Sequence, residues 1–459
     1  MTAAEAKTLK IPMPAGRLNR RTVERSNAFG RSAMIQADLI IEGAAELLTL
    51  RGNSIRPRRG EEMRDLGIVR QGALAARRGK IVWVGPTADL LTSVRPLAFS
   101  RLIDAYGKTV MPGLVDPHTH LVFAGTRENE FAMRIQGKTY QEIATAGGGI
   151  NATVAATRKA SRQELKTAAR KSLDRMLTLG TTTVEAKSGY GLELETELKM
   201  LEVIRELTEE GPMTVVPTFM GAHEIPPEFR QNPEAYVDLV ITRMIPKVAA
   251  RKLARFCDVF CETGVFSPEQ SERIFRAAAG LGLEARVHAD ELTDLGGAAM
   301  AARIKARTAD HLLFASDAGI RQMAAAGVIA VLLPGTAHFL HLERYARARD
   351  MIAAGVPMAL ATDFNPGSCM TESMPLIMNI ACTQMRMHPA EAITAATINA
   401  AWAIGEEDCA GSLDVGKRAD ILILDAPTHE HLCYHFGVNL VETVIKNGKA
   451  VVEEGQRVR

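Results

Sequence analysis

The stretch VMPGLVDPHTHLVFAGTRENE (110–130) begins with an apolar run around a Pro-Gly pair and then places two histidines, His118 and His120, at the end of that run. A continuous apolar run of this length is typical of a buried β-strand. On a strand, residues i and i+2 point to the same face, so both imidazoles would lie on one side of the sheet. The stretch therefore predicts a buried strand that ends in two histidines facing one space.

Apolar segments of this kind alternate with amphipathic helical segments from residue 109 to residue 365. The helical segments include 192–210 and 267–282, and the second begins with the capping box formed by Ser267 and Gln270. Continuous apolar strands that alternate with helices indicate a parallel sheet covered on both faces, and eight such units favour an α/β fold of the (β/α)8 TIM-barrel type. The predicted strands span 109–120, 181–189, 213–223, 255–262, 284–290, 306–314, 328–335 and 357–365.

Both ends of the chain carry shorter β-strand signals. Alternating apolar runs with glycine breaks lie within 36–108 and 411–459, and an Asn-Gly turn is predicted at 447–448. We expect these two segments to form one small β-sandwich domain, with the metal-dependent barrel over 109–410 between them. Residues 1–35 are rich in arginine and lack periodicity, which predicts an exposed, flexible basic arm, with a basic surface patch as the functional alternative.

The composition excludes several kinds of partner. The formal net charge is +2 and 24% of the residues are charged, so charge gives no reason to expect a nucleic-acid or membrane partner. Six cysteines in 459 residues do not suggest a disulfide framework, and no signal peptide or membrane-spanning apolar segment stands out. We therefore expect a reduced, soluble, cytoplasmic protein that acts on a small molecule.

Polar side chains gather where the predicted strands end. In a barrel of this kind the active site lies at the carboxyl ends of the strands. Ordinary turn residues would be enough for folding, so a shared functional site is the economical explanation of this concentration. The residues concerned are His118, His120, Lys187, Tyr190, His223, Glu262, His288, His311, Asp363 and Asn365, with His338 after the seventh strand.

Two histidines alone would not establish a metal site. An isolated His-x-His pair more often consists of hydrogen-bonded core histidines, but His288 and Asp363 stand at equivalent strand ends. Three neutral imidazoles and one carboxylate suit one divalent metal, Zn²⁺ or Fe²⁺, with a position left for water. Water held by such a metal loses a proton near neutral pH, which predicts hydrolytic chemistry.

Hydrolysis also requires groups that move protons. Glu291 and His311 could each shuttle a proton or polarise a carbonyl, and Asp363 could accept the proton of the water. For Glu291, a carboxylate that caps the start of a helix is an equally good explanation. Lys187 has two interpretations, a carbamylated bridge between two metals or a structural lysine.

Six motifs resemble, in order and spacing, the imidazolonepropionase family of the amidohydrolase superfamily. They are HTHLVFAGTRENEF, KSGYGLELETELKML, GAHEIPP, VHADEL, ADHL and ATDFNPGS. The likeness extends over roughly 36–455 and leaves the first 35 residues unmatched. A His-x-His pair is general to the superfamily, whereas TRENEF, KSGYG and DFNPGS together are much more specific.

The resemblance implies a hydrolase of histidine degradation that opens the ring of 4-imidazolone-5-propanoate to N-formimidoyl-L-glutamate, by attack of a metal-bound hydroxide on the ring carbonyl. It implies one metal, a structural role for Lys187 and, from family habit, a homodimer. Arg127 matches the residue that pairs with the propanoate, a task that suits the fork of a guanidinium group. The implied metal ligands are His118, His120, His288 and Asp363; the catalytic residues Glu291, His311 and Asp363; the further substrate contacts Tyr190, His223, Glu291, Asn365, Gly367 and Ser368.

Two other functions remain open at this point. The first is a metal-dependent amidohydrolase or deaminase that acts on another cyclic amide or heterocycle, for which Arg127 would have no acid to hold. The second is a non-catalytic scaffold or binding homologue, against which the four intact ligand positions argue. The sequence alone does not identify the native metal or the role of His338.

Overall fold

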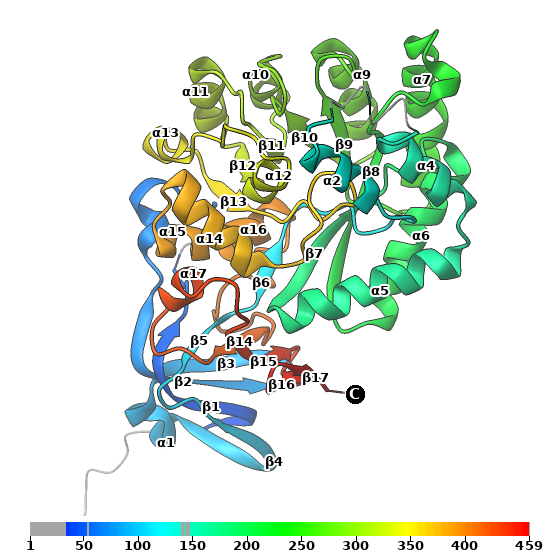
Figure 1. Cartoon of the computed structure of the whole chain (residues 1–459). Helices are drawn as coiled ribbons and strands as arrows, with labels where there is room; N and C mark the ends of the chain where they lie inside the picture. Colours follow the sequence, from blue (N-terminus) through cyan, green and yellow to red (C-terminus); the bar gives the residue numbers. More distant parts are fainter. Residues whose placement is uncertain (1–33, 53–54, 139–141, 143–146, 459) are drawn as a thin grey trace, which may run out of the picture. The chain divides into compact units, whose positions relative to one another are not determined.

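Eight parallel strands form the central sheet of the computed structural model, which describes residues 34–52, 55–138, 142 and 147–458 (Figure 1). Their order in the sheet follows their order along the chain, as expected for a (β/α)8 barrel. The strands are β6 (Leu114–Asp116), β7 (Thr181–Lys187), β8 (Thr214–Ala222), β9 (Phe256–Cys261), β10 (Glu284–Ala289), β11 (Thr308–His311), β12 (Ile329–Leu332) and β13 (Met358–Leu360).

The sheet closes just beyond the ends of its first and last strands. Thr119 and Phe364 form a parallel bridge there. The N–H of Asp363 donates to the carbonyl oxygen of His118 (3.1 Å), and the N–H of His120 donates to that of Phe364 (3.0 Å). The backbone pairing that closes the barrel therefore also places His118, His120 and Asp363 side by side.

Helices follow the barrel strands and surround the sheet (Figure 1). They are α2 (Glu128–Ile135), α4 (Ile150–Lys159), α5 (Arg162–Thr178), α6 (Leu194–Glu210), α7 (Pro233–Leu239), the π-helix η4 (Val240–Met244), α8 (Ile245–Ala250), α9 (Pro268–Ala279), α10 (Gly297–Arg303), α11 (Asp317–Ala326), α12 (Pro334–Phe339), α13 (Ala348–Ala353), α14 (Met374–Met385), α15 (Pro389–Ala395) and α16 (Ile398–Ala403). Two short helices, α1 (Leu90–Ser93) and α17 (His431–Tyr434), lie in the terminal segments.

Helix α9 begins as its sequence predicts. The N–H of Gln270 donates to the hydroxyl of Ser267 (3.2 Å), and the Gln270 side chain accepts the N–H of Ser267 (2.9 Å). Ile274, Phe275 and Ala278 are buried, because their spacing puts them on one face of the helix. The barrel strands lack such alternation since both of their faces are covered, and β7 is buried at every position.

The two ends of the chain build a second sheet, whose order is β17-β16-β15-β14-β5-β1-β2-β3 with β4 paired to β1. In Figure 1 the blue N-terminal strands lie beside the orange and red C-terminal strands. Asn447 and Gly448 form the predicted turn, with φ values of 51° and 75°. This sheet confirms the small β-domain expected from both termini. Its strands are β1 (Ile35–Leu48), β2 (Ile68–Arg77), β3 (Lys80–Pro86), β4 (Val94–Asp104), β5 (Thr109–Pro112), β14 (Ile421–Leu424), β15 (Val441–Lys446), β16 (Lys449–Glu453) and β17 (Gln456–Arg457).

The strand predicted over 109–120 is divided between the two sheets. Its first part, β5, pairs with β1 and β14 in the terminal sheet, whereas β6 belongs to the barrel. Gly113 lies between them, where a Cβ atom would come within 2.3 Å of the Thr182 hydroxyl. The prediction of one strand was wrong, because an apolar run does not reveal which of two sheets it enters.

The arm predicted over 1–35 lies outside the described residues except for its last two. Of these, Ile35 is already the first residue of β1. Contacts between Cα atoms make Ile35–Arg459 one compact unit. The domain boundaries predicted at 108/109 and 410/411 stay predictions.

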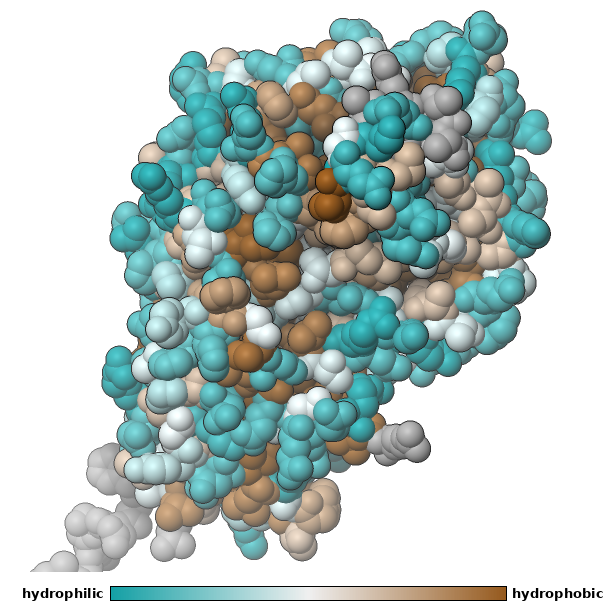
Figure 2. Space-filling model, in the orientation of Figure 1, coloured by the Kyte–Doolittle hydropathy of each residue, from teal (hydrophilic) through white to brown (hydrophobic). Residues whose placement is uncertain are grey.

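The surface is of mixed character. On the face drawn in Figure 2, hydrophilic residues dominate the periphery and hydrophobic residues gather toward the middle. Among the described residues, no helix has the length and apolar character needed to cross a membrane.

Candidate metal and substrate site

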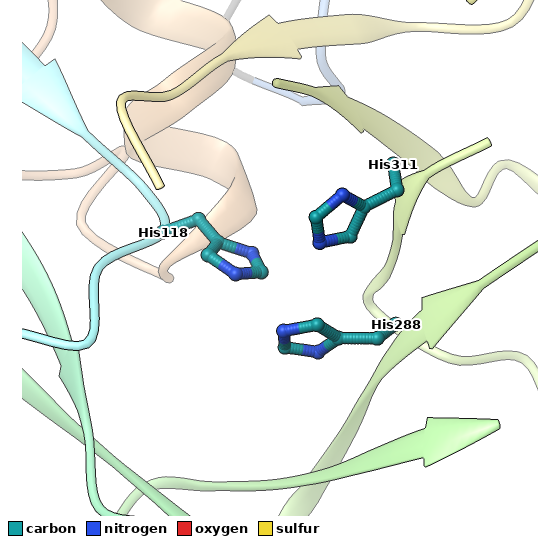
Figure 3. Close-up of side chains that lie close together, drawn as sticks. All are labelled: His118, His288 and His311. Carbon is teal, nitrogen blue, oxygen red and sulfur yellow. The ribbon is translucent and has the colours of Figure 1, made fainter. Parts of the chain in front are cut away.

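Histidine side chains from three parts of the barrel converge at the carboxyl ends of its strands (Figure 3). His118 follows β6, His288 lies on β10 and His311 ends β11. The ring centroids of His118 and His288 are 4.5 Å apart, and those of His288 and His311 are 5.1 Å apart. All three side chains are buried. Strand ends from opposite sides of the barrel thus deliver imidazoles into one space.

His120 and Asp363 complete the group. Nε2 of His120 lies 3.4 Å from Nε2 of His288. Oδ1 of Asp363 lies 3.5 Å from Nε2 of His118 and 3.6 Å from Nε2 of His120. The structure therefore brings the four predicted metal ligands together, with His311 as a neighbour of His118 and His288.

These spacings fit one divalent metal ion. Nε2 of His118 is buried and has no hydrogen-bond partner in the described part of the chain, and a bound cation would give this nitrogen a partner. Metal–nitrogen bonds of about 2.0–2.1 Å put tetrahedral ligand atoms about 3.3–3.4 Å apart. The distances of 3.4, 3.5 and 3.6 Å between the ligand atoms are close to that value. Imidazoles with one carboxylate also form the kind of ligand set that Zn²⁺ and Fe²⁺ accept.

Buried carboxylates orient two of the imidazoles. Nδ1 of His118 lies 2.6 Å from Oδ2 of Asp310, and Nδ1 of His288 lies 3.0 Å from Oδ1 of Asp258. Both carboxylates are fully buried. When Nδ1 donates its proton to a carboxylate, Nε2 keeps its lone pair for the site. The two aspartates therefore fix both the orientation and the tautomer of these histidines.

Two buried cations hold these carboxylates in turn. Nζ of Lys187 lies 2.9 Å from Asp258 and 2.9 Å from Glu185, and Nη2 of Arg286 lies 3.1 Å from Asp310. Although burial lowers it, the charges of Asp258 and Glu185 keep the pKa of Lys187 above its usual value. An ion-paired ammonium group at this position favours the structural interpretation of Lys187 over the carbamylated one.

Burial keeps four histidines of the site neutral. It holds the pKa of His118, His120 and His311 well below the usual value and lowers that of His223 to about 3. The neutral imidazole is the form that binds metals. Burial also raises the pKa of Asp363 to about 6, and a bound cation would lower it again.

His311 and Asp363 adopt left-handed backbone conformations, with φ values of 75° and 55°. Such values are strained for residues other than glycine and collect at functional sites. The Thr336 hydroxyl donates to Oδ2 of Asp363 (2.6 Å), and the Asn365 amide donates to the Asp363 carbonyl oxygen (2.7 Å). These contacts hold Asp363 in the left-handed conformation, which it would rarely adopt without them.

Glu291 lies next to His311, with 3.5 Å between Oε2 and Nε2. Burial, and then the charge of Asp363, raises the pKa of Glu291 well above its usual value, so that its carboxyl group retains a proton more readily. Both ring nitrogens of His311 lack hydrogen-bond partners among the described residues. Helix α10 begins only at Gly297, so Glu291 does not cap its start. The pair is suited to proton transfer.

His223 and Tyr190 form a wall beside His120. The rings of His223 and His120 are stacked, with centroids 4.8 Å apart and planes 17° apart, and Tyr190 lies 5.3 Å from His223. Nδ1 of His223 donates to the carbonyl oxygen of Gly189 (2.9 Å). Oε1 of Glu197 accepts the N–H of Gly189 (3.2 Å) and two further N–H groups of the same loop. The loop that carries Tyr190 is therefore fixed.

Arg127 lies against the loop that contains Asn365, Gly367 and Ser368. Nε and Nη2 of Arg127 donate to the two carboxylate oxygens of Glu130, at 2.9 and 2.7 Å. A Cβ atom at Gly367 would lie 2.1 Å from Nη1 of Arg127. Oδ1 of Asn365 accepts the N–H groups of Gly367 (2.8 Å) and Ser368 (2.7 Å). The predicted acid-binding group and the predicted substrate loop are in contact.

The sequence analysis missed the residues that support this site. Four of them share one signal, a charged residue inside an otherwise apolar strand: Glu185, Asp258, Arg286 and Asp310. Such residues are rarely buried without a specific partner. The missed residues are Glu130, Glu185, Glu197, Asp258, Arg286, Asp310 and Thr336.

Two other features of the chain are weaker candidates for a functional site. Glu46, His429 and Glu430 lie close enough to hold a metal, but Nδ1 of His429 serves both carboxylates (2.8 and 3.4 Å), and Arg70 already pairs with Glu46 (3.2 Å). This group is explained as an ion-pair cluster. His338 lies on α12 and is exposed.

Comparison with known proteins agrees with this geometry. Residues 126–452 match the family model described as the amidohydrolase family. The chain is 54% identical over 424 residues to an imidazolonepropionase of Symbiobacterium thermophilum, covering 92% of this chain and 99% of that protein. It is 55% identical over 417 residues to an imidazolonepropionase of Brevibacillus brevis, covering 91% of this chain and 98% of that protein.

Solved structures share the fold at much lower identity. A triazine hydrolase variant matches with a TM-score of 0.69 at 18% identity, over 92% of this chain and 96% of that chain. An adenosine deaminase from Xanthomonas campestris matches with a TM-score of 0.65 at 19% identity, over 93% and 95%. These likenesses concern the fold, whereas the sequence relatives show the family. The chain belongs to the amidohydrolase family and, within it, to the imidazolonepropionases.

Proposed function

We propose that this protein hydrolyses 4-imidazolone-5-propanoate to N-formimidoyl-L-glutamate in histidine degradation. The observation that carries the proposal is the pairing of two features in one site. The imidazoles of the site and Asp363 converge with their ligand atoms 3.4–3.6 Å apart, and the guanidinium of Arg127 lies against the loop that follows Asp363. The first suits ring hydrolysis and the second suits an acid-bearing substrate.

His118, His120, His288 and Asp363 would hold one divalent metal, for which Zn²⁺ and Fe²⁺ are both suited. When bound, such an ion supplies Lewis-acid chemistry, since it acidifies water and polarises carbonyl groups. The other proposed groups act on the substrate itself. Arg127 binds the propanoate, Tyr190 and His223 contact the substrate, and the loop of Asn365, Gly367 and Ser368 binds substrate or product.

Proton transfer is assigned to Asp363 and Glu291, and polarisation of the carbonyl group to His311. Water adds to the ring carbonyl carbon and gives up a proton to Asp363, while His311 polarises the carbonyl oxygen. Glu291 delivers a proton to the ring nitrogen as its bond to the carbonyl carbon breaks. The buried position of Glu291 supports this role, because its raised pKa favours the protonated form that can donate.

Glu291→Gln is expected to keep its metal but to slow turnover by about 10²–10⁴-fold, the usual contribution of a positioned acid or base. Turnover and metal content are measured on the same preparation. The amide keeps the size of the side chain and removes only its exchangeable acid proton. Loss of the metal in this variant would mean that Glu291 is a ligand, and unchanged turnover would remove it from the mechanism.

Arg127→Ala is expected to raise the KM for the imidazolone strongly, because the propanoate loses its charged partner. An effect of about 2–5 kcal/mol is typical when one member of a buried charge pair is removed. Steady-state kinetics on the imidazolone measures it. Unchanged kinetics would direct attention to cyclic amides or heterocycles without an acid, which the named relatives do not favour.

We further propose a homodimer located in the cytoplasm. All six cysteines are free thiols, which agrees with a reducing compartment. Size-exclusion chromatography with light scattering tests the assembly, and a monomeric mass would contradict it.

A further inference from the structure

The guanidinium of Arg127 is held from two sides by groups to which the sequence analysis gave no such role. One is Glu130, which accepts from Nε and Nη2 at 2.9 and 2.7 Å. The other is Gly367, whose α-carbon faces Nη1 so closely that a Cβ atom would lie 2.1 Å away. The side chains of Arg127 and Glu130 are only 14% and 10% exposed, so water screens their pairing weakly.

Glu130 cannot easily turn away from Arg127. Its Oε1 also accepts the N–H of Gly149 (2.9 Å), at the start of α4. Glu130 lies on α2, and Arg134 on the same helix donates to the carbonyl oxygen of Gly367 (3.0 Å). Helix α2 is thus tied to the substrate loop on one side and to α4 on the other, with Arg127 between them.

Among the described residues, these contacts leave one edge of the guanidinium without a hydrogen-bond partner. An arginine offers a carboxylate two bidentate edges, one formed by Nε with Nη2 and one formed by Nη1 with Nη2. Glu130 occupies the first edge, so an incoming acid must use the second. Gly367 lies beside Nη1. Because glycine has no side chain, it leaves room at this edge for the carboxylate of the substrate.

We infer that Glu130 and Gly367 are positioning residues that select substrates with a carboxylate by fixing the Nη1–Nη2 edge of Arg127; this inference rests on the proposed function. Glu130 sets the rotation of the guanidinium, and Gly367 sets its distance from the substrate loop. The backbone of Gly367 is not in the left-handed region. A Gly367→Ala substitution would therefore clash with Arg127 and would not strain the backbone.

The test measures binding by calorimetry to the metal-loaded full chain. The probes are imidazole-4-propanoate, which has the acid chain but no bond to hydrolyse, and its uncharged amide. Glu130→Gln retains an acceptor for Gly149 but cannot accept from both Arg127 nitrogens. Gly367→Ala adds one methyl group at the guanidinium. The matched controls are Glu128→Ala, an exposed glutamate of α2, and Gly280→Ala, where a Cβ atom meets only ordinary contacts at 3.5 Å.

Glu130→Gln and Gly367→Ala are each expected to weaken binding of the acid probe by about 10- to 100-fold and to change binding of the amide probe little. The two control variants should bind both probes as the unmodified protein does. In the Arg127→Ala background, Glu130→Gln and Gly367→Ala should cost nothing further, because the group that they position is absent. Equal weakening of acid and amide, or full additivity with Arg127→Ala, would overturn the inference and assign both residues a general structural role.

The assay separates this inference from the proposed function. Hydrolysis of the imidazolone by the unmodified protein, together with unchanged acid binding in both variants, would retain the function and reject the positioning. Preference for the acid probe that both variants lose, without any imidazolone hydrolysis, would retain the positioning and reject the proposed reaction.

Discussion

His118→Ala is expected to lose both its metal and all measurable imidazolone hydrolysis. Nε2 of His118 lies 3.5 Å from Oδ1 of Asp363, and its Nδ1 is anchored by Asp310 at 2.6 Å. No other described side chain replaces an imidazole fixed in this way. Asp363→Ala should have the same effect, because it removes the one carboxylate of the predicted ligand set.

The measurement combines metal analysis with turnover. His429→Ala is the matched control, since His429 is a buried histidine in the separate ion-pair cluster of the terminal domain. Circular dichroism of each variant checks folding. Normal turnover in His118→Ala or Asp363→Ala would contradict the metal assignment, and so would a full complement of metal in both.

Lys187→Met is expected to destabilise the protein and to weaken metal binding together. The ammonium group is fully buried between Glu185 and Asp258, and its removal leaves two buried carboxylates without their cation. Loss of one partner of a buried ion pair costs about 3–5 kcal/mol. Because Asp258 orients His288, the metal affinity should also fall by about 10–100-fold, as for other groups that support a ligand.

Denaturant unfolding of the metal-free protein gives the loss of stability, and competition with a chelator gives the metal affinity. Lys171→Met, at an exposed position of α5, is the control. If Lys187→Met lowered the free energy of unfolding without changing metal affinity, Lys187 would stabilise the barrel alone. If it changed neither quantity, the buried charge network would have no energetic role.

Much of this site was predictable, because the topology of the strands determines where its side chains lie. Carboxyl ends of parallel barrel strands meet at one edge, so polar residues that follow apolar runs were expected to come together. His118, His288 and Asp363 do so, although they are separated by 170 and 75 positions in the sequence. Capping at Ser267 and the turn at Asn447 were predictable for a different reason, since both depend on neighbours in the chain.

The supporting contacts were not predictable in the same way. The pairing of Lys187 with Asp258 joins alternate strands, and that of Arg286 with Asp310 joins adjacent strands, so both pairings depend on which residues share a level in the barrel. Pattern and composition do not encode that register. The division of 109–120 between two sheets was not predicted for a related reason, because both sheets accept a buried apolar strand.

Metal content and imidazolone consumption, determined on the same purified sample before and after chelation, test together whether this protein is a metal-dependent imidazolone hydrolase. Consumption is followed by the loss of the ultraviolet absorbance of the substrate. We expect about one divalent metal per chain, rapid decay of the imidazolone, loss of that decay on chelation and its return with Zn²⁺ or Fe²⁺. Metal-loaded protein that leaves the imidazolone unchanged would contradict the substrate, and equally rapid decay in metal-free protein would contradict the metal site.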